Sequence, residues 1–328
     1  MQLRKPKVSF GVPVYNAERY LPHLLDSILA QDFQDFEIVI CDNDSTDQTQ
    51  SICRAYAQRD QRVRFHWNDC NIGQVANVNR VFELSRGEYY RFIGADDWLE
   101  PDYLTKCVNM LDERPETIGV STFQDFIDDE GNRYYSEYEG ERFESSKPHR
   151  RFARMLWFTN ANYLYVDPLY CLIRSDAMRK TKLCQMLPRM DGILAAELAL
   201  IGDFQHIPEC LAHRRREHKP NQATKEAILQ RFHPTRWREL EHSNAKICNA
   251  YMTMIRESDM NIWEKANCTA SVAKYFTAAA GRDSIKNVKT TLRNIPGYQF
   301  LKAVARPLPA FQALWRSFDQ RKSVAVSN

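Results

Sequence analysis

The sequence predicts an α/β protein with a mostly parallel sheet flanked by helices, followed by an α-helical C-terminal extension. Strand and helix patterns alternate through the first 125 residues, as a parallel sheet with helices on both faces requires. Beyond Lys219 no strand pattern remains, and residues 225–282 read as helices. With 328 residues and 44% hydrophobic content, the chain can bury one large core and a smaller appendage. We therefore expect a domain at residues 1–220 and an extension at 221–328.

The first half of the sheet domain is predicted element by element. The apolar run "KVSFGVPVY" indicates a strand, and residues 20–29 carry apolar side chains at helical spacing, with Asn16 available as a cap. "FEIVIC" is typical of a strand buried on both faces. Ser45 and Gln48 then have the spacing of a capping box that opens a second helix. Further strands are expected at residues 63–67 and 89–93, and further helices at 73–86 and 101–111.

The second half of the domain has a different pattern. "STFQDFIDDEGNRYYSEY" predicts two strands joined by a turn, a hairpin added to the sheet. A helix is expected to start at Ser175, and another in "PRMDGILAAELALIGDF", with Asp191 near its amino terminus. "HIPECLAHRRREH" predicts a short strand that ends in a basic cluster.

Polar side chains occur where three predicted strands end. In folds of this kind, ligands bind outside the carboxyl ends of the strands. Adjacent carboxylates such as Asp96 and Asp97 repel unless a cation, a hydrogen-bond donor or solvent relieves them. The pair therefore indicates either a metal and phosphate site or a solvated turn before a helix that begins at Pro101. The residues at the three strand ends are Pro13, Tyr15 and Asn16, then Asp42, Asn43 and Asp44, then Asp96 and Asp97.

Cysteine usage and hydropathy bear on the compartment. Nine cysteines, an odd number without a C-x-x-C pair, argue against a disulfide framework and a zinc knuckle. No signal peptide is visible, and no stretch approaches the roughly 20 apolar residues that span a bilayer. We expect a cytoplasmic protein.

The charge is concentrated at the carboxyl end. Residues 285–328 carry eight basic residues and one acid, although the net charge of the whole chain is only +3. This basic tail, which also contains aromatic residues, suits the surface of an anionic membrane or a nucleic acid. The alternative is a helical appendage that is solvated or packs on the sheet domain as a lid.

The motifs of two enzyme classes that share this alternation of strands and helices are missing from the sequence. A dinucleotide-dependent oxidoreductase needs a G-x-G-x-x-G turn after a strand, which the contexts of Gly11, Gly73 and Gly87 do not supply. A kinase or nucleotidyltransferase needs a glycine loop that cradles phosphate, and this is also absent.

Four segments together resemble the inverting family 2 glycosyltransferases of the GT-A fold, of the type that acts in bacterial polysaccharide and glycan biosynthesis. The resemblance covers about residues 7–218 and implies a nucleotide-sugar transferase domain at residues 1–220. It further implies transfer of a hexosyl or N-acetylhexosaminyl group from a UDP-sugar to a hydroxyl of a glycan or lipid-linked saccharide, with Mn²⁺ or Mg²⁺. The segments are residues 8–49, residues 71–104, "MDGILAAELALIG" and "HRRREH".

By this resemblance, "GADD" stands where the family has its D-x-D motif. Gly94 replaces the first Asp, and Asp96 matches the second, so Asp96 is expected to bind the metal and the nucleotide diphosphate. Asp97 is either a second metal ligand or a helix-capping group. The absence of an acid at position 94 weakens the expected metal site.

The resemblance also implies a set of nucleotide-binding residues. Tyr15 is expected to stack on the nucleobase, the alternative being a core tyrosine, and Asn16 could be only a helix cap. Asn43 stands where the family has an acid that accepts from the uracil N–H, and Val78 stands where many relatives have Arg. The full set on the sheet side is Pro13, Tyr15, Asn16, Asp42, Asn43, Asn79 and Asp96.

The family takes its general base from an acid at the start of a late helix, which Asp191 matches. Met190 replaces the Glu that usually precedes it, and the alternative is a first-turn acid that only favours the helix dipole. Arg216 and His218 match the R-x-H expected to face the diphosphate, or form a solvated basic turn.

The expected partners are thus a nucleotide-sugar donor, a saccharide acceptor and an anionic membrane surface contacted by residues 285–328 on its inner face. No nucleic acid is expected. Two alternatives stay open: a catalytically impaired relative that binds a sugar nucleotide, and a nucleic-acid-binding protein with a basic tail.

Overall fold

The computed structural model describes residues 5–128, 130–135, 145–158, 170–215, 225–241 and 243–279. Its strands are β1 Val8–Val14, β2 Phe36–Asp42, β3 Val63–Trp67, β4 Tyr89–Phe92, β5 Trp98–Leu99, β6 Thr117–Ile127, β7 Arg133–Tyr135, β8 Leu172–Arg174 and β9 Asp203–Arg215. Its helices are α1 Leu21–Leu29, α2 Thr49–Arg59, α3 Gln74–Leu84, α4 Tyr103–Glu113, α5 Pro148–Phe158, α6 Ser175–Arg179, α7 Met190–Ile201, α8 Lys225–Phe232, α9 Asn244–Glu257 and α10 Ile262–Ala279. A 3₁₀ helix, η2, spans Trp237–Leu240.

The first half of the sheet is parallel, in the order β3-β2-β1-β4. β1 and β2 pair along their whole length, so that Val14 lies beside Asp42. Their carboxyl ends therefore meet at one edge, and β4 ends next to them. The predicted α/β class and the strand and helix alternation of this half are confirmed.

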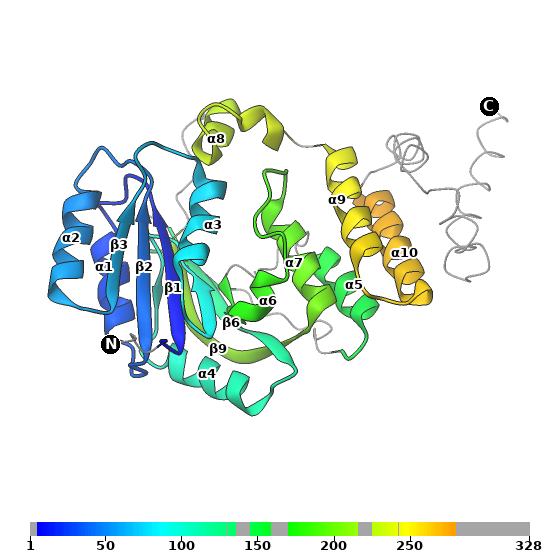
Figure 1. Ribbon diagram of the computed structural model, residues 1–328, viewed down its shortest axis with the longest axis horizontal. Coiled ribbons are helices and arrows are strands. Elements are labelled where there is room, and N and C mark those ends of the chain that lie inside the picture. Colours follow the sequence, from blue (N-terminus) through cyan, green and yellow to red (C-terminus); the bar gives the residue numbers. More distant parts are fainter. Residues whose placement is uncertain are drawn as a thin grey trace.

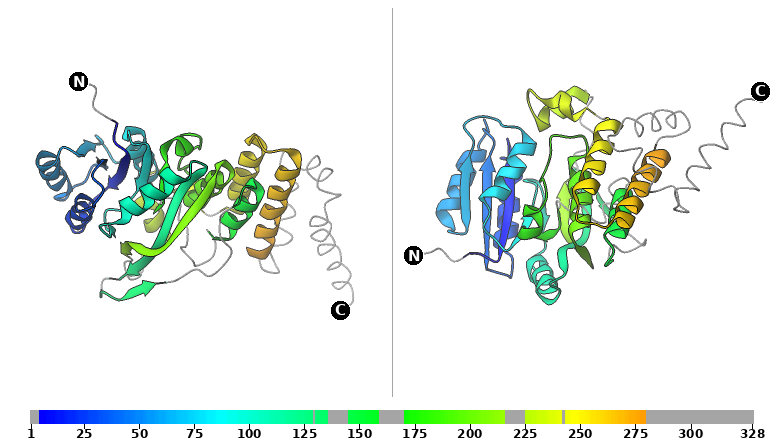
Figure 2. Two further views of the ribbon diagram at one scale, coloured as in Figure 1. Left: turned by 90° about the horizontal axis from the view of Figure 1, so that it is seen from below. Right: turned by 45° about the vertical axis from the view of Figure 1, so that its right-hand side comes forward.

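The second half of the sheet mixes both directions. β8 runs antiparallel between β4 and β6, whereas β9 runs parallel to β6. Figure 2 shows β6 and β9 as long strands side by side, so β9 is longer than the short strand expected there. The predicted hairpin is present as β6 and β7, and β5 pairs with the end of β9.

Helices cover both faces of the sheet. Tyr89 of β4 packs in a core with α1 and α4, and the next residue, Tyr90, packs in a second core with α3 and α7. This alternation is the one that a strand buried on both faces requires. The extension adds α9 and α10, which lie against α5 and α7 (Figure 1) and share a third core with them. Among the described residues, no helix is both long and apolar enough to cross a membrane.

Three predicted helix starts are wrong. Asn16 does not cap α1, which begins after Tyr20 without a side-chain cap bond. Gln48 is the N-cap of α2 and makes no side-chain cap bond, and the backbone N–H of Ser45 donates to Asp42, so the predicted capping box is not formed. α4 begins at Tyr103, two residues after Pro101. In the first two cases the polar side chain bonds to the other loop: Asn16 Oδ1 accepts from the N–H of Thr46, and Ser45 Oγ accepts from the N–H of Asn16.

Candidate active site

Hydrogen bonds tie together the loops that follow β1 and β2. Asn16 donates its backbone N–H to Ser45 Oγ at 2.8 Å, and Asn16 Oδ1 accepts from the N–H of Thr46 at 2.9 Å. Asp42 is fully buried and accepts from the N–H of Ser45 at 3.0 Å and from Gln50 Nε2 at 2.9 Å. Asn16 and Asp42 are thus brought together as predicted, and they fix the shape of this edge.

Tyr15 stands at the same edge with half of its surface exposed (50%). The alternative of a core tyrosine is therefore wrong, and the ring is accessible to a ligand. Pro13 is half-buried in β1, where it pairs with Cys41 of β2. The structure places both residues where the carboxyl ends of β1 and β2 meet.

Asn43 directs its amide into the protein. Its Oδ1 accepts from Asn68 Nδ2 and from the N–H of Ile72, both at 3.0 Å, and its Nδ2 donates to Asn71 Oδ1 at 2.9 Å. The side chain is buried, and its oxygen has two donors within the chain. Asn43 therefore holds the loop after β3 against β2, and its expected bond to uracil stays a prediction.

Asn79 makes a reciprocal pair of bonds with a distant backbone. Its Nδ2 donates to the carbonyl of Cys184 at 2.9 Å, and its Oδ1 accepts from the N–H of Cys184 at 3.0 Å. The segment held in this way leads to α7, and two of its residues, Leu183 and Arg189, have φ angles of 55° and 59°. Asn79, expected to contact nucleotide, anchors a loop that the sequence did not connect with it.

The two adjacent acids, Asp96 and Asp97, which we call the acid pair, lie close to Gly94 just after β4. Asp97 Oδ2 accepts from the N–H of Gly94 at 3.2 Å. A Cβ on Gly94 would lie 2.8 Å from Asp97 Oδ2 and 3.0 Å from Asp96 Oδ1. The two carboxylates thus fill the space that an acid at position 94 would enter. The alternative of Asp97 as a helix cap is wrong, because the N-cap of α4 is Asp102.

Burial raises the pKa of Asp97 to about 7, while nearby Arg214 and Arg91 favour its ionised form and Asp96 opposes it. Asp97 is 4% exposed, whereas Asp96 is half-buried at the rim. A cation at this position would offset the repulsion between the two carboxylates, and carboxylate oxygens are the ligands that Mg²⁺ and Mn²⁺ prefer. The residues present fit such an ion.

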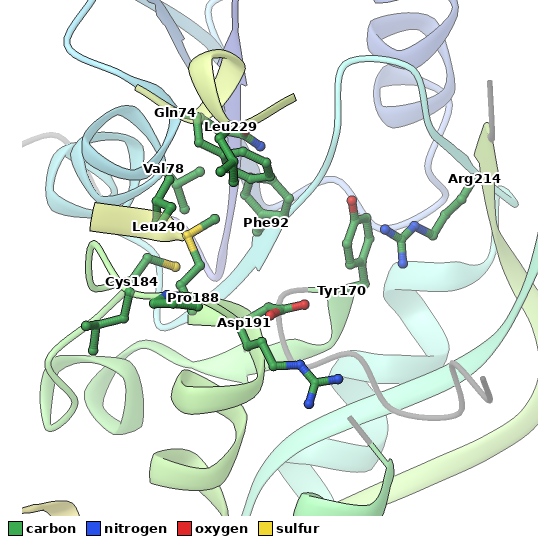
Figure 3. A pocket seen from close by; sticks show the side chains of 14 residues that line it. Gln74, Val78, Phe92, Tyr170, Cys184, Pro188, Asp191, Arg214, Leu229 and Leu240 are labelled. Carbon is green, nitrogen blue, oxygen red and sulfur yellow. The ribbon is translucent and has the colours of Figure 1, made fainter. Parts of the chain in front are cut away.

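Asp191 lies in the first turn of α7, as predicted. Its Oδ1 accepts from the N–H of Gly192 at 2.8 Å, and the side chain is exposed. The residue lines a cavity of about 310 Å³. Figure 3 shows its carboxylate on the same side of this cavity as Tyr170 and Arg214. The lining residues are Gln74, Val78, Phe92, Tyr170, Cys184, Leu187, Pro188, Arg189, Met190, Asp191, Arg214, Leu229, Phe232 and Leu240.

Arg214 links this cavity to the acid pair. Its guanidinium lies 3.5 Å from the ring centroid of Tyr170, whose carbonyl accepts from Arg91, and its charge favours ionised Asp97. Sequence reasoning placed Arg214 in a basic cluster but assigned the phosphate role to Arg216. Strand alternation distinguishes Arg214 from its two neighbours, His213 and Arg215, which lie on the other face of β9, but it does not distinguish positions 214 and 216.

His213 belongs to a second polar cluster, together with Asp125 and Glu100. His213 Nδ1 lies 2.6 Å from Asp125 Oδ1 and its Nε2 lies 2.8 Å from Glu100 Oε1, while Trp98 stacks on the ring. Burial lowers the pKa of His213, but the two carboxylates outweigh burial and raise it above its ordinary value. Cys210, Asp125 and His213 place possible metal-ligand atoms within 4.8 Å of one another. A carboxylate at each ring nitrogen favours the protonated imidazole, in which both nitrogens can donate.

Several predicted residues are outside the described part of the chain. Arg216 and His218 are among them, as is the whole basic tail at residues 285–328. Conversely, the extension contributes Leu229, Phe232 and Leu240 to the cavity, which sequence reasoning missed. No local pattern signals these three, because only long-range packing brings them to α7.

Comparison with known proteins gives curated relatives that match part of the chain. Glycosyltransferase GlyA of Streptococcus pneumoniae serotype 4 is 34% identical over 129 residues, which is 39% of this chain and 18% of GlyA. Chondroitin synthase of Escherichia coli is 35% identical over 135 residues, 41% of this chain and 20% of the synthase. The matched regions make up less than two thirds of these relatives.

Solved structures match nearly the whole chain at low identity. Staphylococcus aureus TarS 1–349 in complex with UDP-GlcNAc has a TM-score of 0.60 at 15% identity and covers 96% of this chain and 92% of its own. The mannosyltransferase PcManGT from Pyrobaculum calidifontis, in complex with GDP-Man and Mn²⁺, has a TM-score of 0.51 at 15% identity, with coverages of 95% and 88%. These likenesses show the fold, which is the GT-A fold expected from the sequence.

The family model described as glycosyl transferase family 2 matches residues 9–181. This region contains the strand ends, the acid pair and the Asn79 anchor, and it extends over more than half of the 328 residues. The protein belongs to glycosyl transferase family 2.

Proposed function

We propose that this protein is an inverting glycosyltransferase that moves a sugar from a nucleotide-diphosphate sugar to an acceptor hydroxyl. The observation that carries the proposal is the position of Asp191: an exposed carboxylate in a cavity that also holds Arg214, whose charge acts on the acid pair. Inversion needs one base near the acceptor and stabilisation of the leaving group opposite to it. Asp191 would supply the base, and Arg214 together with the acid pair would stabilise the leaving group.

In the proposed reaction, the oxygen of the acceptor hydroxyl attacks the anomeric carbon, and Asp191 takes the proton of that hydroxyl. The bond between that carbon and the diphosphate oxygen breaks, and the diphosphate leaves with the bonding electrons. Arg214 lies between Asp191 and the acid pair and favours the developing negative charge. Tyr170 supports the guanidinium through its ring face.

Asp96 and Asp97 are the residues that would hold Mn²⁺ or Mg²⁺ with the diphosphate. Such a cation supplies Lewis-acid stabilisation of the leaving group. The carboxylates meet over Gly94, so Asp97 takes up the space that the first acid of a D-x-D motif would enter. This arrangement supports a cation site despite the missing acid.

The donor we propose is a UDP-sugar carrying a hexosyl or N-acetylhexosaminyl group, and the acceptor a glycan or lipid-linked saccharide. TarS in complex with UDP-GlcNAc and PcManGT with GDP-Man support nucleotide-sugar binding by this fold. The accessible ring of Tyr15 suits stacking on the base. Arg216 and His218 would face the diphosphate.

We also propose a cytoplasmic protein that docks on the inner face of a membrane through residues 285–328. The support is compositional, since this segment combines eight basic residues with aromatic anchors. Docking would bring the transferase domain, residues 1–220, to a lipid-linked acceptor.

The experiment is a panel of UDP-, GDP- and dTDP-sugars incubated with the full-length protein and Mn²⁺, measuring release of the nucleoside diphosphate. Release from one class of donor, lost in Asp191→Asn when an acceptor is present, is the expected result. Binding of a donor without any turnover would favour an impaired relative. Salt-sensitive nucleic-acid binding without turnover would favour the third class.

A further inference from the structure

The cavity at Asp191 has walls from two parts of the chain. Strand β4, helix α3 and the loop before α7 form one side, and the extension forms another with Leu229 and Phe232 of α8 and Leu240 of η2. α8 is seated closely on the start of α3. A Cβ on Gly73 would lie 2.8 Å from the carbonyl oxygen of Phe232 and would clash with backbone.

The two ends of the cavity differ in chemistry. Figure 3 shows Asp191, Tyr170 and Arg214 toward one end, and toward the other end mostly apolar side chains with Gln74 among them. All three residues from the extension are apolar, and Figure 3 shows two of them, Leu229 and Leu240, near Val78 and Phe92 of the sheet domain. Val78 stands where the family resemblance would place an Arg, so this position adds to the apolar end.

We propose that the apolar end binds a hydrocarbon group attached to the acceptor sugar, so that the substrate is an amphipathic glycoside whose hydroxyl meets Asp191. This inference rests on the proposed function. A donor sugar is a poor occupant, because its hydroxyls would lose water and, apart from Gln74, find few hydrogen-bond partners among leucine, valine and phenylalanine. A hydrocarbon group loses nothing there and gains burial.

The volume limits the length of that group. About 310 Å³ is at the lower end of the range for ligand pockets, which leaves room for a short apolar segment next to one sugar ring. The extension thus acts as a wall that selects the acceptor.

The test uses a homologous series of alkyl glycosides of one sugar, from methyl to octyl, as acceptors below their micelle concentrations. With the full-length protein and its donor, the acceptor KM should fall about fourfold for each buried methylene and then level off. A KM that is flat along the series would overturn the inference. If methyl glycosides are nevertheless glycosylated, the proposed function stands; if no donor is turned over, the proposed function itself fails.

Two wall variants sharpen the test. Phe232→Ala and Leu229→Ala, both at half-buried positions, should weaken the preference for octyl over methyl glycoside at least tenfold. Ile262→Ala is the matched control, an apolar truncation in the extension at a side chain that is 58% exposed and does not line the cavity. An unchanged preference in both folded wall variants would refute the assignment. The wild-type series decides the matter if neither variant folds.

Discussion

Replacing Asp191 by Asn tests the proposed chemistry with little disturbance of the fold. Asparagine has nearly the same shape but cannot take a proton at neutral pH. Asp191 is exposed, and it accepts a hydrogen bond from the N–H of the next residue, Gly192, at 2.8 Å, which an amide oxygen can also accept. The loss of charge in the first turn should cost at most about 1 kcal/mol in the free energy of unfolding.

The expected loss of activity is much larger than this loss of stability. Removal of a general base lowers kcat by about a hundredfold or more, equivalent to about 2.7 kcal/mol in the activation free energy. The KM for the donor should change little, because the base acts on the acceptor. The assay measures kcat and the donor KM of the transfer, with thermal unfolding alongside.

Asp176→Asn is the matched control. Asp176 is also a first-turn acid, in α6, and its ion pair with Arg179 at 2.6 Å is solvent-exposed. It should lose less than about 1 kcal/mol of stability and keep kcat. If Asp191→Asn behaves like this control, Asp191 is a helix-dipole acid and not the base. An equal loss of donor binding would make it a binding residue.

Four further perturbations have defined outcomes. Asp96→Ala should abolish transfer at limiting Mn²⁺ with an unchanged melting temperature, and near wild-type activity would exclude it as the metal ligand. Tyr275→Phe removes the bond to Arg189, whose left-handed backbone precedes α7, and should lower kcat about fivefold. An unchanged kcat would show that this contact from the extension does not help to position Asp191. His213→Gln should cost about 2 kcal/mol below pH 6.5, and the difference from wild type in urea unfolding should shrink as pH rises through the raised pKa of His213; a constant difference refutes its protonated state. Deleting residues 285–328 should abolish salt-sensitive cosedimentation with anionic vesicles, whereas equal binding by the truncated protein removes the docking proposal.

The sequence predicted the parallel half of the fold because its signals are local. Continuous apolar runs gave β1, β2 and β4, and strand ends in such a sheet meet at one edge. The positions of Asp96 and Asp191 were predictable for the same reason, since one follows a strand and the other starts a helix; their roles stay predictions. Helix starts were less predictable. Asn16 was predicted to cap the helix in its own segment, but it accepts from the N–H of Thr46 in the other loop, which only the packing of β1 on β2 brings close.

The rest of the site depends on contacts between distant segments. Asn43 and Asn79 carry the amides expected of nucleotide contacts, yet Asn43 bonds to atoms of the loop after β3 and Asn79 bonds to the backbone of Cys184. Arg214 could be separated from Arg216 only through the register of β9 on β6, where Arg214 lies beside Phe126. Residue type alone does not specify whether a polar group faces a ligand or another part of its own chain.

The extension and the sheet domain depend on each other physically. The pattern changes from strands to helices near residue 220, but the core does not, because Ile193 and Ala196 of α7 are buried in the same cluster as Tyr251 of α9 and Val272 of α10. Without α9 and α10, this face of α7 would be exposed to water directly beside Asp191. A helix that carries a base must hold it within a fraction of an ångström. Here the packing of α9 and α10 on the buried face of α7 fixes the orientation of that helix. The helical extension is therefore as much a condition for the proposed chemistry as the acid pair at the end of β4.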